Sequence, residues 1–375
     1  MNEKLLNLPV LLQGLRAQGL DAAVVASPEN FFYLGSVKIQ TQTLIRDRMA
    51  LGIVTADGAI TLVVCATEVA QTRRYSWVED IRSYQEFVQT PMSVVAEVLE
   101  EKGLSRARLG IEERYVAAHH HRDLATRVPK ATLTSCDESF ERARMIKTEP
   151  EIARMRVAAK GTDEAILRAL QAARPGVAEH TLARMMSDAL FDIGHGTFRD
   201  ITWGVAVGAN ILTTHYWAEE SVLMPGEMVR INLRSACRGY FSHLYRRAVV
   251  GSASERQRSW YERAREVHVR CIDRLRPGAR ACDLFHAARE DMSRLKVDAH
   301  GSHVGHSTGI ALHEGLRLQP LDDTPLQAGM VIASEPMMMD PGVSIYHLED
   351  LVLVTDGYPV LLSDRTPTET IFEIR

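Results

Sequence analysis

A chain of 375 residues is long for one hydrophobic core and predicts two domains. Its hydrophobic share of 46%, charged share of 25% and net charge of −4 are ordinary for a globular protein, so we expect no nucleic-acid or membrane partner. No apolar run approaches the ~20 residues that span a bilayer, and the N-terminus lacks a signal-peptide pattern. The five cysteines are odd in number and form no CxxC pair, which favours reduced thiols and a cytoplasmic location.

The first part of the chain alternates helix-like and strand-like segments. The expected elements are a helix at 5–19, a strand at 21–26, a helix from Ser27, a hairpin around Asp57-Gly58, a helix at 94–102, a strand at 108–111 and a helix at 117–127. This alternation predicts an α/β domain over residues 1–143.

A second domain, residues 144–375, is expected to open with a long helix. Thr148 has the side chain of a helix N-cap, and Glu149, Pro150 and Glu151 suit the first turn. The helix should run to about residue 173. No low-complexity stretch or long linker interrupts the rest of the chain.

The second domain contains a repeated pattern. Arg-Pro-Gly triplets end at Gly176 and Gly278 and precede helical runs, while Gly226 and Gly329 open strand-like runs. The two offsets are 102 and 103 residues. A fixed offset predicts one supersecondary unit used twice. We therefore expect two related halves that face each other.

Polar residues occupy matching places in the two halves. Asn232 and Glu335 each follow their glycine by six residues, so they share a register. Glu335 and Glu349 interrupt apolar strand-like runs, and a buried carboxylate must be paired, bound to metal or sharing a proton. Facing halves would bring both glutamates to a common seam with Asn232 and His243.

Two further segments present histidines. His215 lies in a polar loop after the strand-like run 201–207, where it could act as an acid or base near neutral pH. The glycines of the segment GHSTG at 305–309 favour a close-packed backbone that presents His306. His313 follows shortly after this segment.

The charges of these residues bear on metal binding. Five side chains could form a cup of ligands: Asn232, His243, His306, Glu335 and Glu349. Two carboxylates bring a charge of about −2 against +4 for two divalent ions, so a two-metal site would be poorly neutralised. One metal on the two histidines and two glutamates stays open, as does a metal-free network for proton transfer.

The motifs, taken in their order along the chain, resemble the creatinase/prolidase/methionine aminopeptidase family, whose catalytic domain has the pita-bread fold. The resemblance covers nearly the whole chain. It rests on DAAVVASPENFFYL at 21–34, on Met145-Ile146-Lys147 with Glu151, and on His215, Gly305-His306, His313-Glu314, Glu335-Pro336 and Glu349-Asp350. It implies a mixed α/β (α+β) protein with a pseudo-twofold duplicated catalytic domain.

The resemblance also implies a ligand set. Metallopeptidases of the family use Asp, Asp, His, Glu and Glu, and this chain departs from that set at Asn232 and His243. Creatinase is the metal-free branch and has an asparagine where Asn232 stands. By that resemblance His215 is the general acid/base and Glu335 orients or polarises the substrate. We therefore expect a metal-free site, with one divalent metal ion as the alternative.

Substrate-binding candidates follow from the same resemblance. Tyr245 stands where creatinase has a glutamate that helps hold a guanidinium, and a phenol with a reference pKa of about 10 does not replace that charge. His313 belongs to a signature segment of the site. Arg46 and Arg48 lie where the family's N-terminal domain reaches the site of a partner subunit and holds a substrate carboxylate.

The sequence thus predicts a cytoplasmic, homodimeric hydrolase that cleaves a C–N bond of a small amide or amidine carrying a carboxylate. Its catalytic residues would be His215, His306, Glu335 and Glu349. One alternative is a mononuclear-metal enzyme with rebuilt chemistry, which need not be hydrolytic. A second is a non-catalytic binding protein, which would have no need for a buried ionisable set.

Overall fold

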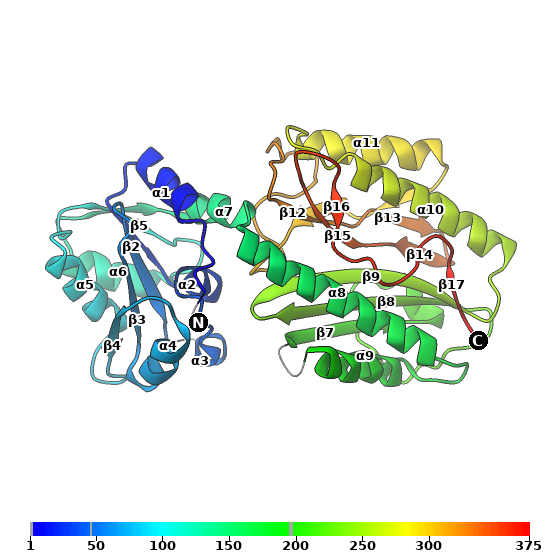
Figure 1. The fold of residues 1–375 in the computed structure, drawn as a ribbon, viewed down its shortest axis with the longest axis horizontal. Coiled ribbons are helices and arrows are strands. Elements are labelled where there is room, and N and C mark those ends of the chain that lie inside the picture. Colours follow the sequence, from blue (N-terminus) through cyan, green and yellow to red (C-terminus); the bar gives the residue numbers. More distant parts are fainter. Residues whose placement is uncertain (1–2, 46, 195–197) are drawn as a thin grey trace. The chain divides into compact units, whose positions relative to one another are not determined.

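The computed structural model describes residues 3–45, 47–194 and 198–375. The chain divides into two compact units, Met1–Arg144 and Met145–Arg375 (Figure 1). Within the described residues, no helix is long and apolar enough to cross a membrane.

The first unit is built on a six-stranded sheet of order β4-β3-β2-β1-β5-β6. Its strands are β1 Ala22–Val25, β2 Leu51–Thr55, β3 Ile60–Cys65, β4 Asp80–Tyr84, β5 Arg108–Ile111 and β6 Thr132–Ser135. Its helices are α1 Leu8–Ala17, α2 Pro28–Gly35, α3 Gln40–Leu44, η1 Ala66–Glu68, α4 Val69–Tyr75, α5 Pro91–Glu101, α6 Ala118–Arg127 and α7 Asp137–Met145. Strands β2 and β3 form the expected antiparallel hairpin, and β2 also pairs antiparallel with β1. The pairs β1–β5, β3–β4 and β5–β6 are parallel.

The second unit opens with the expected long helix, α8 Glu149–Ala172. The side chain of Thr148 accepts a hydrogen bond from the Glu151 N–H, and the Glu151 carboxylate accepts one from the Thr148 N–H at 2.8 Å. This capping box satisfies backbone donors at the helix start. The other elements of the first half are α9 Glu179–Gly194, β7 Phe198–Ala206, η2 Gly208–Leu212, β8 Met228–Cys237 and β9 Tyr240–Val250.

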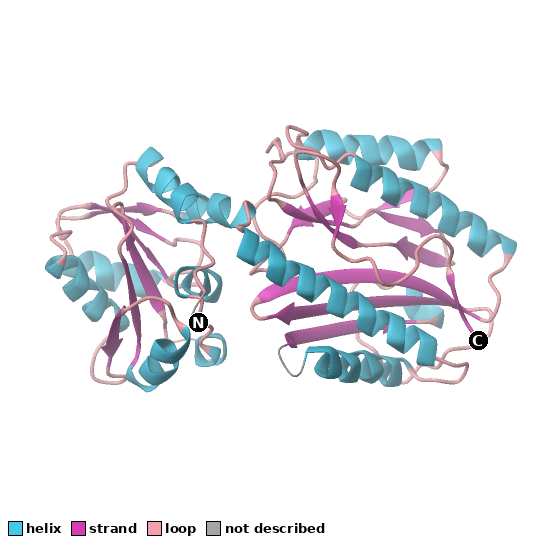
Figure 2. Ribbon diagram, in the orientation of Figure 1, coloured by secondary structure: helices cyan, strands magenta, loops and turns pink. Residues whose placement is uncertain are grey.

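The second half repeats the order of helices followed by strands. Its elements are α10 Glu255–Asp273, α11 Ala281–Arg294, β10 Asp298–His300, β11 Gly305–Ser307, β12 Val331–Ser334, β13 Met337–Asp340, β14 Ser344–His347, β15 Asp350–Leu353, β16 Val360–Leu361 and β17 Phe372–Ile374. Three antiparallel-rich sheets result, with orders β17-β9-β8-β7, β11-β12-β15-β16 and β10-β13-β14. Helix α8 packs against β8 and β9, as Figure 2 shows.

The internal repeat expected from the sequence is present in the backbone. Gly176 and Gly278 adopt φ values of +85° and +86°, a left-handed conformation that favours glycine. Their N–H groups donate to Leu223 and Leu326, respectively, at 2.8 Å in both halves. The same glycine turn, bonded to the carbonyl of an equivalent leucine, therefore recurs in both halves at the predicted offset. The predicted mixed α/β class and the repeat within the second domain are confirmed.

The two glutamates lie at strand ends rather than inside strands. Glu335 connects β12 to β13, which belong to different sheets, and Glu349 connects β14 to β15 in the same way. The strand-like run that Glu349 interrupts is thus two strands, β14 and β15. A chain that changes sheet at each glutamate can aim both carboxylates into the space between the sheets.

Candidate metal centre

Strands β8 and β9 present one face to the site. Asn232 is opposite Tyr245, and Arg234 is opposite His243, in an antiparallel ladder. Because side chains alternate along a strand, His243 and Tyr245 lie on the same face as Asn232 and Arg234. The opposite face packs on α8.

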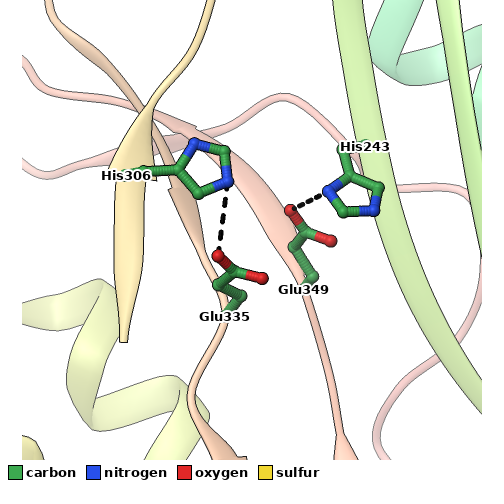
Figure 3. Close-up of side chains that lie close together, drawn as sticks. All are labelled: His243, His306, Glu335 and Glu349. Carbon is green, nitrogen blue, oxygen red and sulfur yellow. Dashed lines mark ion pairs between the residues drawn. The ribbon is translucent and has the colours of Figure 1, made fainter. Parts of the chain in front are cut away.

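Four side chains from the two halves converge. His243, His306, Glu335 and Glu349 are all buried, and each offers one ligand atom within 4.8 Å of the others. The Nδ1 atom of His243 lies 3.1 Å from Oε1 of Glu349, and Nε2 of His306 lies 3.3 Å from Oε1 of Glu335 (Figure 3). The seam expected between the halves therefore contains a compact group of two imidazoles and two carboxylates.

Both histidines are turned so that an unprotonated nitrogen faces this group. Nε2 of His243 donates to Oδ1 of Asn232 at 2.8 Å, and Nδ1 of His306 donates to the Ser307 carbonyl at 3.1 Å. A neutral imidazole has one N–H, so the other nitrogen keeps its lone pair. Burial lowers the pKa of both rings, well below the usual range for His243, which favours the neutral form that binds metals.

The two carboxyl groups have opposite pKa shifts. Burial by itself raises the pKa of Glu335, but hydrogen bonds from His303 and His347 and the charge of His306 outweigh it, and the pKa lies well below its usual range. Burial raises the pKa of Glu349 well above its usual range, and the charge of Glu335 raises it further. Such opposed shifts mark two carboxylates that share one enclosed space, where a cation would stabilise both.

Two histidines that carry no motif in the sequence support Glu335. His303 Nε2 contacts Glu335 Oε1 at 2.8 Å, and His347 Nε2 lies 3.3 Å from the other oxygen. The ring of His347 also stacks on Tyr245, with centroids 3.7 Å apart. The only sequence signal for His347 is its spacing of two residues before Glu349, and this becomes informative once the strand is known.

The predicted substrate-binding residues lie in different places. His313 is half-buried and stacks on His306 with centroids 3.5 Å apart, and burial lowers its pKa to about 4. The Tyr245 hydroxyl accepts a hydrogen bond from the Asn232 amide at 2.5 Å. Arg48 is held by both oxygens of Glu86, at 3.1 and 2.7 Å. The predicted Arg46 lies outside the described residues.

His215 lies in an exposed loop after η2 and is not one of the four converging residues. A buried carboxylate fixes this loop: Glu179 accepts the N–H groups of Val207 at 2.9 Å and Glu219 at 3.0 Å, and also the Tyr216 hydroxyl. The backbone on both sides of His215 is therefore anchored. Exposure leaves its ring accessible to a ligand.

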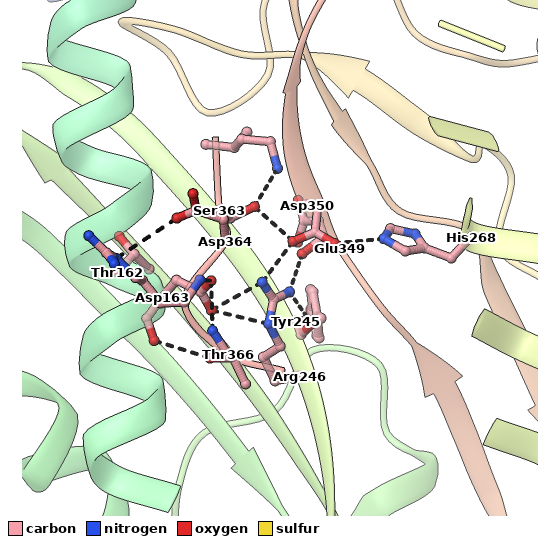
Figure 4. Close-up of polar contacts among 12 residues, drawn as sticks. Thr162, Asp163, Tyr245, Arg246, His268, Glu349, Asp350, Ser363, Asp364 and Thr366 are labelled. Carbon is pink, nitrogen blue, oxygen red and sulfur yellow. Dashed lines mark hydrogen bonds and ion pairs between the residues drawn. The ribbon is translucent and has the colours of Figure 1, made fainter. Parts of the chain in front are cut away.

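A buried arginine connects the two halves behind the site. Arg246 donates to the carbonyl of Glu349 at 2.6 Å, to Asp350 at 2.7 Å and to Asp163 of α8 at 3.2 Å (Figure 4). Asp350 also accepts from His268 at 2.8 Å. The network fixes the backbone of Glu349, and so the direction of its carboxylate.

The atoms that face the centre fit a metal ion. Among the described residues, Nδ1 of His243, Nε2 of His306 and both oxygens of Glu349 are buried without a hydrogen-bond partner. Buried polar atoms are normally satisfied, so such a set calls for a ligand. Two imidazoles and two carboxylates are ligands that first-row divalent metals take, and their charge of about −2 neutralises one such ion. Asn232 is engaged with His243 and Tyr245 instead of pointing at the centre as a fifth ligand.

Comparison with known proteins agrees with this chemistry. Residues 153–356 match metallopeptidase family M24, and residues 8–146 match the creatinase/prolidase N-terminal domain. This chain belongs to metallopeptidase family M24. The first match alone covers more than half of its length.

Several relatives of this M24 chain have names. It is 26% identical to a Xaa-Pro dipeptidase of Lactobacillus helveticus, covering 94% of this chain and 95% of the relative. It is 27% identical to a creatinase of Bacillus sp. (strain B-0618), covering 90% and 85%. The structure of a Xaa-Pro dipeptidase from Bacillus anthracis shares the fold, with a TM-score of 0.83, 21% identity and 98% of each chain covered. The predicted family and the predicted class, a hydrolase of C–N bonds, agree with these relatives.

The expectation of a metal-free site was wrong. The chain falls in a metallopeptidase family, and the described structure brings a buried His/Glu group to metal-binding separation. Asn232 and His243 stand where the family resemblance implies two aspartates, and the loss of both negative charges suggested a metal-free site. His243 compensates in part, since a neutral imidazole remains a good ligand for one ion without that charge.

Proposed function

We propose that the domain of residues 144–375 hydrolyses a C–N bond of a small amide or amidine substrate that carries a carboxylate, using one divalent metal ion. The observation that carries the proposal is the convergence of His243, His306, Glu335 and Glu349 within 4.8 Å. Among the described residues, His243, His306 and Glu349 of this group have buried atoms without a hydrogen-bond partner. Relatives named Xaa-Pro dipeptidase make Xaa-Pro dipeptides the first substrates to test.

The four ligands would hold the ion, and other residues would hold the ligands. When bound, the ion supplies Lewis acidity and a stronger water nucleophile at neutral pH. Asn232 fixes the tautomer of His243, while His303 and His347 keep Glu335 ionised. Such supporting contacts set the orientation and basicity of metal ligands.

His215 is the proposed acid/base that moves a proton to the leaving nitrogen. Its place on a loop anchored by Glu179 supports this role, because the ring is exposed to solvent while the backbone is held. An imidazole can both accept and donate the proton.

The test is an assay of purified protein loaded separately with Mn²⁺, Co²⁺, Zn²⁺ or Fe²⁺, against a panel of Xaa-Pro dipeptides and small amides and amidines. Hydrolysis that requires the ion and is lost in Glu335→Gln supports the proposal. Metal binding without hydrolysis of any panel member would favour rebuilt, non-hydrolytic chemistry. Neither metal binding nor hydrolysis would favour a binding protein and overturn the proposal.

We also propose a cytoplasmic homodimer in which the partner's N-terminal domain completes the site. Reduced thiols support the location, since all five cysteines are free. The dimer follows from the family resemblance, and light scattering on the eluted protein would test it. Because Arg48 is already paired with Glu86, its role toward a partner's substrate requires that this pair open.

A further inference from the structure

Two arginines on the site face of β8 and β9 are buried without an acidic partner among the described residues. Arg230 and Arg247 are directly opposite each other in the ladder and are 2% and 3% exposed. All three nitrogens of the Arg247 guanidinium, and Nη1 of Arg230, have no hydrogen-bond partner in the described part of the chain. Arg230 does donate through Nη2 to the carbonyl of Thr213.

This arrangement is costly without an anion. A buried charge needs pairing, and like charges directly opposite in a sheet repel. Burial lowers the pKa of Arg247 well below its usual range, and the charge of Arg230 lowers it further. The nearby phenols of Tyr261 and Tyr346 have pKa values raised by burial to about 12, so they are neutral at pH 7 and bring no negative charge.

The neighbouring residue shows that the fold can pair such a group. Arg246 is equally buried but points to the other face, where Asp163 and Asp350 take its charge at 3.1 and 2.7 Å. No described carboxylate forms an ion pair with Arg230 or Arg247 within 4 Å. The missing counter-charge is therefore confined to the site face.

The arginine pair is close to the proposed metal centre. Tyr245 lies between His243 and Arg247 on the same face of β9, and the four residue steps from His243 to Arg247 span about 13 Å. The ring of His347 stacks on Tyr245, and the charges of both arginines contribute to lowering the pKa of His347. Arg230 holds the carbonyl of Thr213, two residues before His215. His243 and the arginine pair therefore share one face of the ladder, and Arg230 links this face to the His215 loop.

We propose that Arg230 and Arg247 form the subsite that binds the carboxylate of the substrate, about 13 Å along β9 from His243. This inference rests on the proposed hydrolase function and names its substrate class, an anionic acyl compound with a free carboxylate. A guanidinium binds a carboxylate through two parallel hydrogen bonds, which suits a dry site. The subsite lies in the catalytic domain and does not need Arg48.

The test compares two small probes, N-acetylproline and N-acetylprolinamide. They differ only in that the first carries a carboxylate where the second carries an uncharged amide. Their binding to the metal-loaded protein is measured by calorimetry, so turnover is not needed. We expect the acid to bind roughly 10- to 100-fold more tightly than the amide, and Arg247→Met or Arg230→Met to abolish this difference. Equal binding of both probes by the unmodified protein, or an unchanged preference in both variants, would overturn the subsite.

Folding is controlled within the same set of variants. Removing an unpaired buried charge should leave the melting temperature of Arg247→Met unchanged or raised, whereas Arg246→Met should lower it. Arg247→Lys keeps a charge but loses the paired donors, and we expect an intermediate preference for the acid. A large loss of stability in Arg247→Met would indicate a structural role and contradict the assignment.

Two further measurements complete the test. The first asks whether the bound anion is the substrate carboxylate or free phosphate, and the second distinguishes failure of the subsite from failure of the hydrolase. Phosphate that competes with N-acetylproline at equal concentration would make a free inorganic anion the occupant and overturn the substrate assignment. Preference for the acid without hydrolysis of any substrate would refute the hydrolase while the subsite stands. Hydrolysis of acid and amide substrates with the same KM would refute the subsite while the hydrolase stands.

Discussion

The two faces of the β8–β9 ladder differ in how their polar groups are satisfied. On the face toward α8, Tyr240 donates to Glu151 at 3.0 Å and Arg246 pairs with Asp163. On the other face, His243 Nδ1 and the guanidinium of Arg247 have no hydrogen-bond partner among the described residues. The charged groups of the first face are therefore paired within the fold, whereas those of the second face are left for a ligand. One pair of strands therefore provides both kinds of face, in alternate residues.

The largest expected effect comes from removing a carboxylate on the site face. Glu335→Gln or Glu349→Gln should lower metal-dependent activity roughly a thousandfold or more, because each takes a ligand and a negative charge from the ion. Activity and bound metal are measured together. Glu290→Gln, on an exposed position of α11, is the matched control and should change neither. Full activity in both ligand variants would show that these residues are not at the reaction centre.

The next effect tests the face toward α8. Arg246→Met should lower the free energy of unfolding by roughly 3 to 5 kcal/mol, because it leaves Asp163 and Asp350 buried without their partner. Urea unfolding of the metal-free protein measures it, alongside Arg247→Met. Equal destabilisation by both variants would remove the distinction between the faces.

A third prediction concerns the pH dependence of stability at Glu151, a residue of α8 that contacts the face of the ladder toward α8. Burial raises the pKa of Glu151 to about 7, despite hydrogen bonds from Thr148 and Tyr240. A raised folded-state pKa gives stability that is full below the unfolded value of about 4.5 and is lost as pH rises through about 7. The free energy of unfolding should therefore fall by about 2 to 3 kcal/mol between pH 5 and pH 8 relative to Glu151→Gln, which does not titrate. Parallel pH profiles of the two proteins, measured in urea, would contradict this.

The smallest effect sharpens the role of Asn232. If it orients His243 and is not a ligand, Asn232→Ala should weaken metal affinity by only about 10- to 100-fold, with one ion still bound at saturation. A competition titration with a metal-binding dye measures the affinity. His243→Ala provides the comparison and should cost more. A greater loss in the Asn232 variant would make the amide a ligand.

The repeat and most of the candidate centre could be predicted from the sequence. The pairing of side chains across strands could not. Glycines at fixed offsets and the isolated Glu335 and Glu349 are visible in one chain, because backbone turns and buried carboxylates have local signatures. Arg246 and Arg247 look alike in the sequence. Only the strand register sends one to Asp163, 83 residues away, and leaves the other without a partner in the part of the chain that the structure describes. The role of His347 depends on the same long-range pairing.

The identity of the ion's ligands was harder to judge than their positions. Counting charge alone at Asn232 and His243 favoured a metal-free site, since it treated the loss of aspartate as the loss of a ligand. The structure turns His243 so that a lone pair faces the glutamates, with Asn232 behind it. Whether these four residues hold an ion stays a prediction.

The most direct test is the number of metal ions per chain, measured by mass spectrometry on protein dialysed after saturation with Mn²⁺ or Zn²⁺. The account predicts one ion in the unmodified protein and two in the double variant Asn232→Asp/His243→Asp, which restores the two aspartates that the family resemblance implies. No bound ion, or two ions in the unmodified protein, would contradict it.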